Sequence, residues 1–295
     1  MLRAIITSLV TAAALFAQSP KLKIFISVDM EGVAGVATAD QLSPGSFEYE
    51  RFRGFMTRET LAAVNAARAA GATDIVVADS HGNGENLLIE QFPPQVRIVR
   101  SWPRHLGMMG GIDSTFDAAM FVGYHASTHN PKGVRAHTFS SARLARVAMN
   151  GINVTEGAWN AAIAGHFNVP VIFVSGDDAA IAEIRAVIGN IEAAETKRAL
   201  GFHSTETLIP EAAQELIREH ATAALRRLKE FKVYKATSPV TVDVTFKSVT
   251  PAETAAYLKM FERTNSHSIR YVAKDMVEAS DIMEFLEKYK IELEP

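Results

Sequence analysis

The chain has 295 residues, of which 48% are hydrophobic and 21% charged, and its formal net charge is −3. This composition excludes a disordered or collagen-like chain, the length predicts two domains, and the charge argues against a dedicated nucleic-acid binder. Nine histidines and no cysteine are present. Disulfides, thiolate nucleophiles and cysteine-ligated metal sites are therefore excluded, and any metal must be held by imidazole and carboxylate groups.

The first twenty residues have the features of an export signal. A basic start at Arg3 precedes an apolar run from Ala4 to Ala17, and the polar segment 18–20 follows. The run is too short to anchor a helix across a bilayer, and the rest of the chain has no longer apolar stretch, so we expect no stable membrane insertion. We predict a signal peptide at 1–20 and an exported protein, periplasmic or secreted. The alternative is an N-terminal helix of a cytoplasmic protein.

Strand and helix patterns alternate through the first half of the chain. Residues 22–28 form a short apolar run rich in β-branched residues, residues 47–70 carry helical spacing that ends at Gly71, and residues 74–78 are a second apolar run. Strand, helix and strand in this order predict an open α/β sheet. Further segments follow: strands at 96–99, 118–122, 143–149 and 169–174, and a helix at 156–167.

The pattern changes in the second half, where helices and single strands are mixed. We predict helices at 211–232, 251–261 and 275–288, and strands at 240–246 and 269–272. The predicted fold class is therefore α/β, with a three-layer αβα sheet domain in residues 21–168 that carries a metal site. Residues 169–295 are predicted to form a second, smaller α+β domain that offers possible oligomer contacts.

Acidic residues and histidines follow the predicted strands. Ligands in an open α/β sheet bind beyond the carboxyl ends of the strands, so residues far apart in sequence meet there. Imidazole and carboxylate ligands suit Zn²⁺, with Mn²⁺ or Co²⁺ as alternatives, and a shared carboxylate can hold two ions roughly 3.5–4 Å apart. Each residue alone has an ordinary reading as a loop histidine or a helix cap, so the prediction rests on their convergence. The residues are Asp29, Glu31, Asp79, His81, His125, His137 and Glu156.

Five short motifs around these residues carry a family resemblance. They are Ser27–Gly32, Ala78–Gly82, Gly123–Ala126, Ala136–Thr138 and Asn153–Gly157. In this order they resemble the zinc-dependent D-aminopeptidase family, the DppA-type metallopeptidases, and segments 175–178 and 195–201 extend the resemblance.

The resemblance implies a binuclear zinc aminopeptidase that acts on short peptides or amides, with D-residues favoured at the N-terminus. It also implies a homo-oligomer. By the same resemblance, His137 matches the catalytic residue, and the ligands of two zinc ions match Asp29, Glu31, His81, His125 and Glu156.

Three side chains have roles that stay open at this point. His137 can act as general base, as proton donor to the leaving amine or as nucleophile, and we favour proton transfer because metal-activated water already provides a nucleophile. Asp79 is expected to orient an imidazole through its ring N–H. Lys197 is read either as a substrate contact or as an exposed lysine.

Two other functions compete with an aminopeptidase. Another binuclear metallohydrolase, an amidase or a phosphoesterase, would use the same ligand types. An exported two-domain protein can also bind peptides without cutting them, but such a protein has no need of the acidic and histidine cluster.

Overall fold

The computed structural model describes residues 21–289. The predicted signal peptide at 1–20 lies outside these residues and stays a prediction. Among the residues described, no helix is long and apolar enough to cross a membrane.

The larger of two sheets has seven strands in the order β3-β2-β1-β4-β7-β8-β9. The strands from β3 to β8 pair in parallel, and β9 returns antiparallel to β8. The central strands are continuous apolar runs because both faces of a parallel sheet are covered. The strands are β1 (Leu22–Val28), β2 (Ala72–Asp79), β3 (Val96–Val99), β4 (Ala118–Tyr124), β7 (Val171–Asp177), β8 (Glu192–Gly201) and β9 (Ser204–Thr207).

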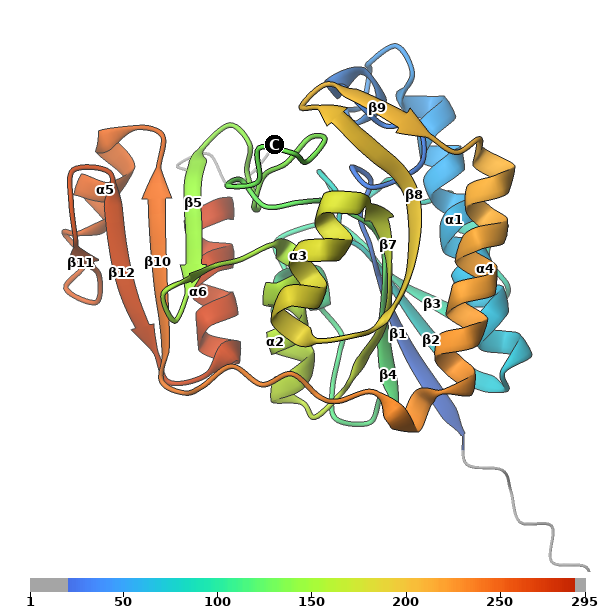
Figure 1. Cartoon of the computed structure of the whole chain (residues 1–295). Coiled ribbons are helices and arrows are strands. Elements are labelled where there is room, and N and C mark those ends of the chain that lie inside the picture. Colours follow the sequence, from blue (N-terminus) through green and yellow to red (C-terminus); the bar gives the residue numbers. More distant parts are fainter. Residues whose placement is uncertain (1–20, 290–295) are drawn as a thin grey trace, which may run out of the picture.

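Helices cover both faces of this sheet, which gives three layers (Figure 1). Alternate residues of β1 point to opposite faces. Ile24 and Ile26 pack in the core under α1 (Tyr49–Ala69) and α4 (Pro210–Arg226). Phe25 packs in the core with α2 (Glu156–His166) and α3 (Asp178–Ile188). The predicted three-layer αβα fold with a parallel sheet is confirmed.

A second sheet of five strands lies beside the first, in the order β11-β12-β10-β5-β6. Its pairs are antiparallel, as in β10 with β5 and β10 with β12. It is built from β5 (Leu144–Met149), β6 (Ile152–Asn153), β10 (Val240–Phe246), β11 (Glu262–Arg263) and β12 (Ser268–Ala273), with helices α5 (Val249–Ala255) and α6 (Met276–Lys288). Short 3-10 turns lie at Ala39–Gln41, Ile89–Gln91, Gly107–Met109 and Leu228–Glu230.

The boundary predicted between residues 168 and 169 does not separate the two sheets. Strands β7, β8 and β9 follow that boundary but complete the large sheet, whereas β5 and β6 precede it and belong to the small sheet. The prediction placed every strand before residue 168 in one sheet because the periodicity of a strand does not identify its partner. It also left α3, β8 and β9 unassigned.

Candidate metal centre

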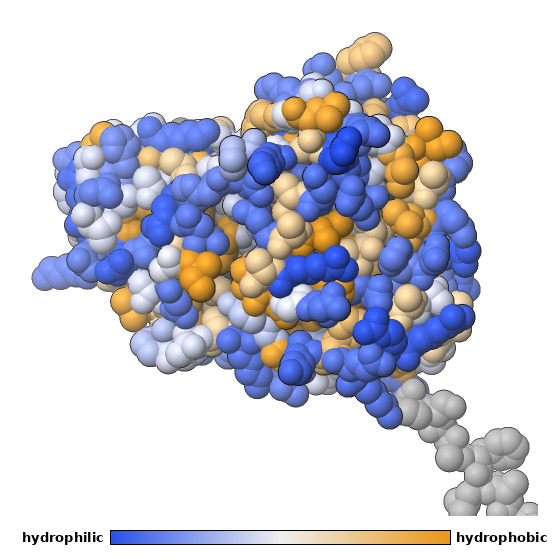
Figure 2. All heavy atoms as spheres, viewed as in Figure 1, coloured by the Kyte–Doolittle hydropathy of each residue, from blue (hydrophilic) through white to orange (hydrophobic). Residues whose placement is uncertain are grey.

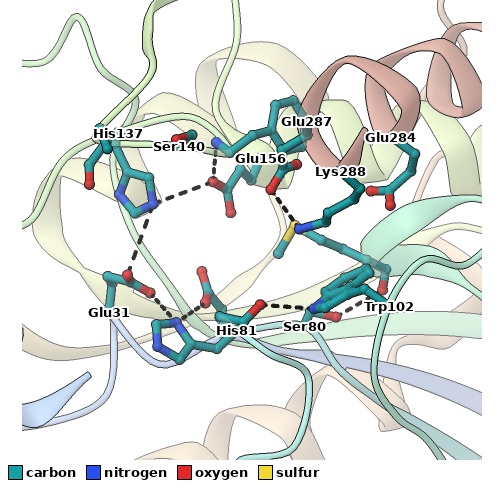
Figure 3. A pocket seen from close by; sticks show the side chains of 16 residues that line it. Glu31, Ser80, His81, Trp102, His137, Ser140, Glu156, Glu284, Glu287 and Lys288 are labelled. Carbon is teal, nitrogen blue, oxygen red and sulfur yellow. Dashed lines mark hydrogen bonds and ion pairs between the residues drawn. The ribbon is translucent and has the colours of Figure 1, made fainter. Parts of the chain in front are cut away.

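Six predicted site residues meet at the carboxyl ends of the large sheet. Figure 3 labels four of them, Glu31, His81, His137 and Glu156. Asp29 and Glu31 follow β1, His81 follows β2, and His125 follows β4. The other two are Glu156, the first residue of α2, and His137, in the segment between β4 and β5. All except His125 line a cavity of about 230 Å³, and His125 is buried beside them.

Glycines bring the ends of β1 and β4 together. The Gly32 N–H donates to the Gly123 carbonyl at 2.7 Å, and a Cβ on Gly32 would lie 2.1 Å from the Tyr124 carbonyl oxygen. Gly123 has a φ of +74°, and a Cβ there would lie 2.3 Å from the Asp29 carbonyl oxygen. Glycine alone permits this backbone approach, which sets the Asp29–Glu31 segment against His125.

Imidazoles and carboxylates alternate around the site. His81 Nδ1 lies 2.9 Å from Glu31 Oε2 and 3.4 Å from Asp29 Oδ1. His125 Nε2 lies 3.2 Å from Asp29 Oδ2 and 3.4 Å from Glu156 Oε2. The outermost imidazole is His137, whose Nε2 is 3.9 Å from one oxygen each of Glu31 and Glu156. Its ring stacks on that of His125, with 4.1 Å between the centroids.

Backbone carbonyls fix the other nitrogen of each ring. His81 Nε2 faces the Leu42 carbonyl at 2.8 Å, His125 Nδ1 faces that of Ala126 at 3.0 Å, and His137 Nδ1 faces that of Arg135 at 2.8 Å. A carbonyl only accepts, so these nitrogens donate, and in the neutral ring the nitrogen facing the site carries a lone pair. Metal-binding histidines are held in this manner.

Two buried side-chain atoms of the site have no hydrogen-bond partner among the described residues. Asp29 Oδ2 and His125 Nε2 are buried and hydrogen-bond to no atom of the described chain. Two groups of side chains each bring their ligand atoms within 4.8 Å of one another: Asp29, Glu31 and His125 in one, and His125, His137 and Glu156 in the other. Oxygen and imidazole nitrogen donors in this arrangement fit zinc.

The electrostatics of the site favour bound positive charge. Burial raises the pKa of Asp29, and the neighbouring charge of Glu31 raises it further. Burial acts in the same direction on Glu31, but the attraction of His81 outweighs it and brings the pKa of Glu31 well below its ordinary value. Burial opposes protonation of His81 and His125, yet the adjacent carboxylates raise the pKa of both imidazoles well above the ordinary value. Three buried carboxylates in one cavity thus attract cations, whether protons or metal ions.

Local structure positions the outer side of the site. The Thr155 side chain caps α2 by accepting from the Ala158 N–H, and Glu156 Oε1 accepts from the Phe139 N–H at 2.6 Å. Arg135 and Phe139, on either side of His137, have φ values of +53° and +61°. Such backbone is unfavourable for residues other than glycine and persists where its surroundings impose it, as they do here around His137.

Sequence and structure comparisons agree on the family. The sequence profile described as D-aminopeptidase matches residues 22–285. The chain belongs to the D-aminopeptidase family. It is 32% identical over 263 residues to the D-aminopeptidase of Bacillus subtilis strain 168, covering 89% of this chain and 95% of that protein.

A solved structure of the family superposes on most of the chain. The Zn-dependent D-aminopeptidase DppA from Bacillus subtilis, described as a self-compartmentalizing protease, matches with a TM-score of 0.86 and 31% identity, over 90% of this chain and 96% of that chain. The resemblance noted in the motifs is thereby confirmed. The protein is a peptidase, a hydrolase of peptide bonds, from a zinc-dependent family.

Asp79 has a different role from the one predicted. Its Oδ2 accepts from the backbone N–H groups of Asn86 and Leu87 at 2.6 and 2.8 Å, and its Oδ1 accepts from the Asn86 side chain at 2.8 Å. The Asn86 side chain also donates to the His81 carbonyl at 2.7 Å. Within the described chain Asp79 therefore shapes the loop that carries His81 and does not bond to an imidazole.

The expectation of an exposed Lys197 is wrong. This lysine lies on β8 with 2% of its surface exposed, and its Nζ donates to the carbonyls of Glu31, Val33 and Val36. Burial lowers its pKa to about 8. Lys197 thus fixes the segment that follows β1 by donating to three of its backbone carbonyls. In the sequence, only the position of Lys197 in the motif 195–201 pointed to a role near the site, because a lysine by itself indicates an exposed position.

The wall opposite these candidate ligands comes from segments that the sequence analysis did not connect to the site. Trp102 forms part of it, and α6 of the small sheet contributes Glu284, Glu287 and Lys288 (Figure 3). The prediction assigned α6 to a domain without site residues. The structure brings it to the cavity because α6 packs against α2, whose first residue is Glu156.

Proposed function

We propose that the protein is a binuclear zinc aminopeptidase that removes the N-terminal residue from short peptides or amides, with a preference for D-residues. The observation that carries the count of two ions is the position of Asp29. Its Oδ1 faces His81 and its Oδ2 faces His125, at 3.4 and 3.2 Å, so one carboxylate lies between two imidazoles. A carboxylate placed in this way can bridge two cations. The preference for D-residues rests on the family alone.

The proposed zinc ligands are Asp29, Glu31, His81, His125 and Glu156. When bound, zinc supplies Lewis acidity toward a peptide carbonyl and lowers the pKa of water toward neutrality. The backbone carbonyls of Leu42 and Ala126 hold the two histidines among these ligands in fixed orientations. The free amine of a peptide can approach the carboxylates of the same site.

We assign His137 to proton transfer. Its side chain is 12% exposed, whereas that of His125 is 1% exposed, so His137 faces the cavity that a substrate would occupy. The Arg135 carbonyl holds its Nδ1 proton, which leaves Nε2 free to take up a proton and to pass it to the leaving amine.

The test of this assignment is His137→Ala with zinc content and turnover measured on the same sample. We expect kcat to fall by about 10²–10⁴-fold, the usual contribution of a general acid or base, with both zinc ions retained. His129→Ala, at an exposed loop position, serves as the control and should leave kcat unchanged. Loss of zinc from the His137 variant would make this residue a ligand instead.

Zinc stoichiometry and a substrate panel test the remaining parts of the proposal. Elemental analysis should give two zinc ions per chain, and a value of one would refute a binuclear site. D- and L-amino-acid amides and dipeptides, with phosphate esters beside them, test reaction class and stereochemistry together. Hydrolysis of the esters but not of the amides or dipeptides would favour the phosphoesterase alternative.

We also propose that the protein forms a homo-oligomer. The related DppA is described as self-compartmentalizing. Exposed apolar side chains lie at the β8–β9 end of the large sheet and the start of α4, where Figure 2 shows hydrophobic surface. They include Leu200, Phe202 and Ile209, which are 64%, 45% and 67% exposed. Light scattering of the wild type and of Leu200→Asp should give an assembly and a smaller species; a monomeric wild type would contradict the proposal.

Export is proposed on the sequence of residues 1–20. N-terminal sequencing of the protein recovered from fractionated host cells tests it. A mature chain that begins near residue 18 to 21, outside the cytoplasm, is expected, and an intact cytoplasmic chain would contradict it.

A further inference from the structure

Lys288 reaches into the cavity from the wall opposite the proposed zinc ligands (Figure 3). It lies in the last turn of α6, and its side chain is 24% exposed. Its Nζ is 2.6 Å from Glu287 Oε1 and 4.4 Å from the centroid of the Trp102 ring. An ammonium group has three N–H donors, and within the described residues only Glu287 accepts from it. Donors of Lys288 are therefore left for a ligand.

Charged side chains of both signs surround Lys288. Arg104 approaches the same Trp102 ring at 3.8 Å, and Arg143 donates to the backbone carbonyls of Leu286 and Glu287. The acids on this side are Asp281, Glu284 and Glu287, so the three cations and the three acids balance. The carbonyl and ring contacts occupy the guanidinium groups, so Lys288 is the cation with the most freedom to bind a ligand in the cavity.

The two walls of the cavity would contact different ends of a peptide substrate. If the N-terminal residue lies at the zinc ligands, the chain after the scissile bond continues across the cavity toward α6. The cavity of about 230 Å³ has room for only a short peptide. The anionic group of a short peptide on this side of the scissile bond is its C-terminal carboxylate, which is the natural partner of an ammonium group.

We propose that Lys288, supported by the Trp102 ring, binds the C-terminal carboxylate of the substrate. The substrate class is then a dipeptide or a similarly short peptide with a free carboxylate, in preference to amides and longer chains. This inference rests on the proposed aminopeptidase function, because it needs the N-terminal residue at the opposite wall.

Binding of two matched ligands tests the proposal without turnover. The probes are reduced D-Ala-D-Ala, in which a methylene group replaces the peptide carbonyl, and the same compound with a terminal carboxamide. Calorimetry on the zinc-loaded protein should show weaker binding of the carboxylate form to Lys288→Met by roughly tenfold or more, the usual loss for a hydrogen bond to a charged group. Binding of the carboxamide should change by no more than about twofold.

Two further variants serve as controls. Lys259→Met removes one positive charge from an exposed position outside the cavity and should bind both ligands like the wild type. Lys288→Arg keeps the charge and should restore most of the affinity for the carboxylate. Equal losses for both ligands in Lys288→Met, or no loss for either, would overturn the proposal.

Turnover separates this proposal from the proposed function. Lys288→Met should raise KM for D-Ala-D-Ala by roughly tenfold and leave KM for D-alanine amide unchanged, because the amide has no carboxylate. If the wild type hydrolyses both substrates and the variant affects them alike, the carboxylate site is refuted and the aminopeptidase stands. If the wild type hydrolyses neither, the aminopeptidase fails, and the binding experiment still decides the carboxylate site.

Discussion

The two walls of the cavity are built in different ways. The zinc-ligand wall comes from the ends of parallel strands, and its five proposed ligands have side chains that are only 1–8% exposed. The opposite wall, here called the α6 wall, comes from α6, which packs with the small sheet, and from Trp102. The side chains of Glu287 and Lys288 are 14% and 24% exposed. Backbone contacts fix the first wall, whereas the second presents more exposed side chains. We therefore propose that the metal chemistry, which needs fixed geometry, lies on the first wall and that substrate selection lies on the second.

The largest effect is expected at the close backbone contact between the ends of β1 and β4, next to the proposed zinc ligands. Gly32→Ala places a Cβ 2.1 Å from the Tyr124 carbonyl oxygen, so the ends of β1 and β4 must separate. We expect a loss of about 3 kcal/mol in the free energy of unfolding, the upper range for overpacking, together with loss of zinc. Denaturant unfolding and elemental analysis measure the two effects.

Gly201→Ala is the matched control for this substitution. A Cβ at Gly201 meets no atom within 4 Å, and its φ lies outside the left-handed region. This variant should unfold like the wild type and keep its zinc. Normal stability and zinc content in Gly32→Ala would show that the zinc-ligand wall adapts more readily than its packing suggests.

A smaller effect is expected from substitution of Lys197, which supports the segment that carries Glu31. Lys197→Met removes the donor to the carbonyls of Glu31, Val33 and Val36. We expect about 2 kcal/mol of lost stability, because buried carbonyls are left without a partner. Zinc affinity should fall about 10–100-fold, as it does when partners of metal ligands are removed. Denaturant unfolding and competition with a chelator measure these changes, and Lys229→Met at the surface is the control. A stable variant with unchanged zinc affinity would leave Lys197 without a positioning role.

The smallest effect is expected on the α6 wall and depends on pH. Burial, with the nearby charge of Glu287, raises the pKa of Glu284 from 4.5 to about 7. The folded state therefore binds more protons than the unfolded state between about pH 4.5 and 7, and the stability that protonated Glu284 provides is lost as pH rises through this window. Glu284→Gln should be more stable than the wild type at pH 8, by on the order of 1–2 kcal/mol, and equally stable near pH 4.5. Thermal unfolding across this range checks the crossover, and parallel profiles would contradict it.

Most of the zinc-ligand wall could be predicted from the sequence because its signals are local. Asp29, His81 and His125 each follow an apolar run that forms a strand by its own composition. Parallel strands in an open sheet bring such ends to one edge, so convergence followed from the fold class. The structure places these side chains in contact.

The α6 wall and the burial of Lys197 could not be predicted in the same way. A charged helix such as α6 has the pattern of a surface helix wherever it packs, and Lys197 carries the residue type that is least often buried. The strand predicted at 143–149 was expected in the large sheet, and the structure pairs it, as β5, with β10 in the small one.

The sequence by itself determined the family, the three-layer sheet and the chemical types gathered at its edge. These depend on short motifs and on the periodicity of single segments. Only the tertiary structure decided that α6 lines the cavity, that β5 joins the small sheet and that Lys197 supports the segment after β1. The physical reason is that each of these facts concerns a partner distant along the chain, and the pattern of one segment does not specify the surface against which it packs.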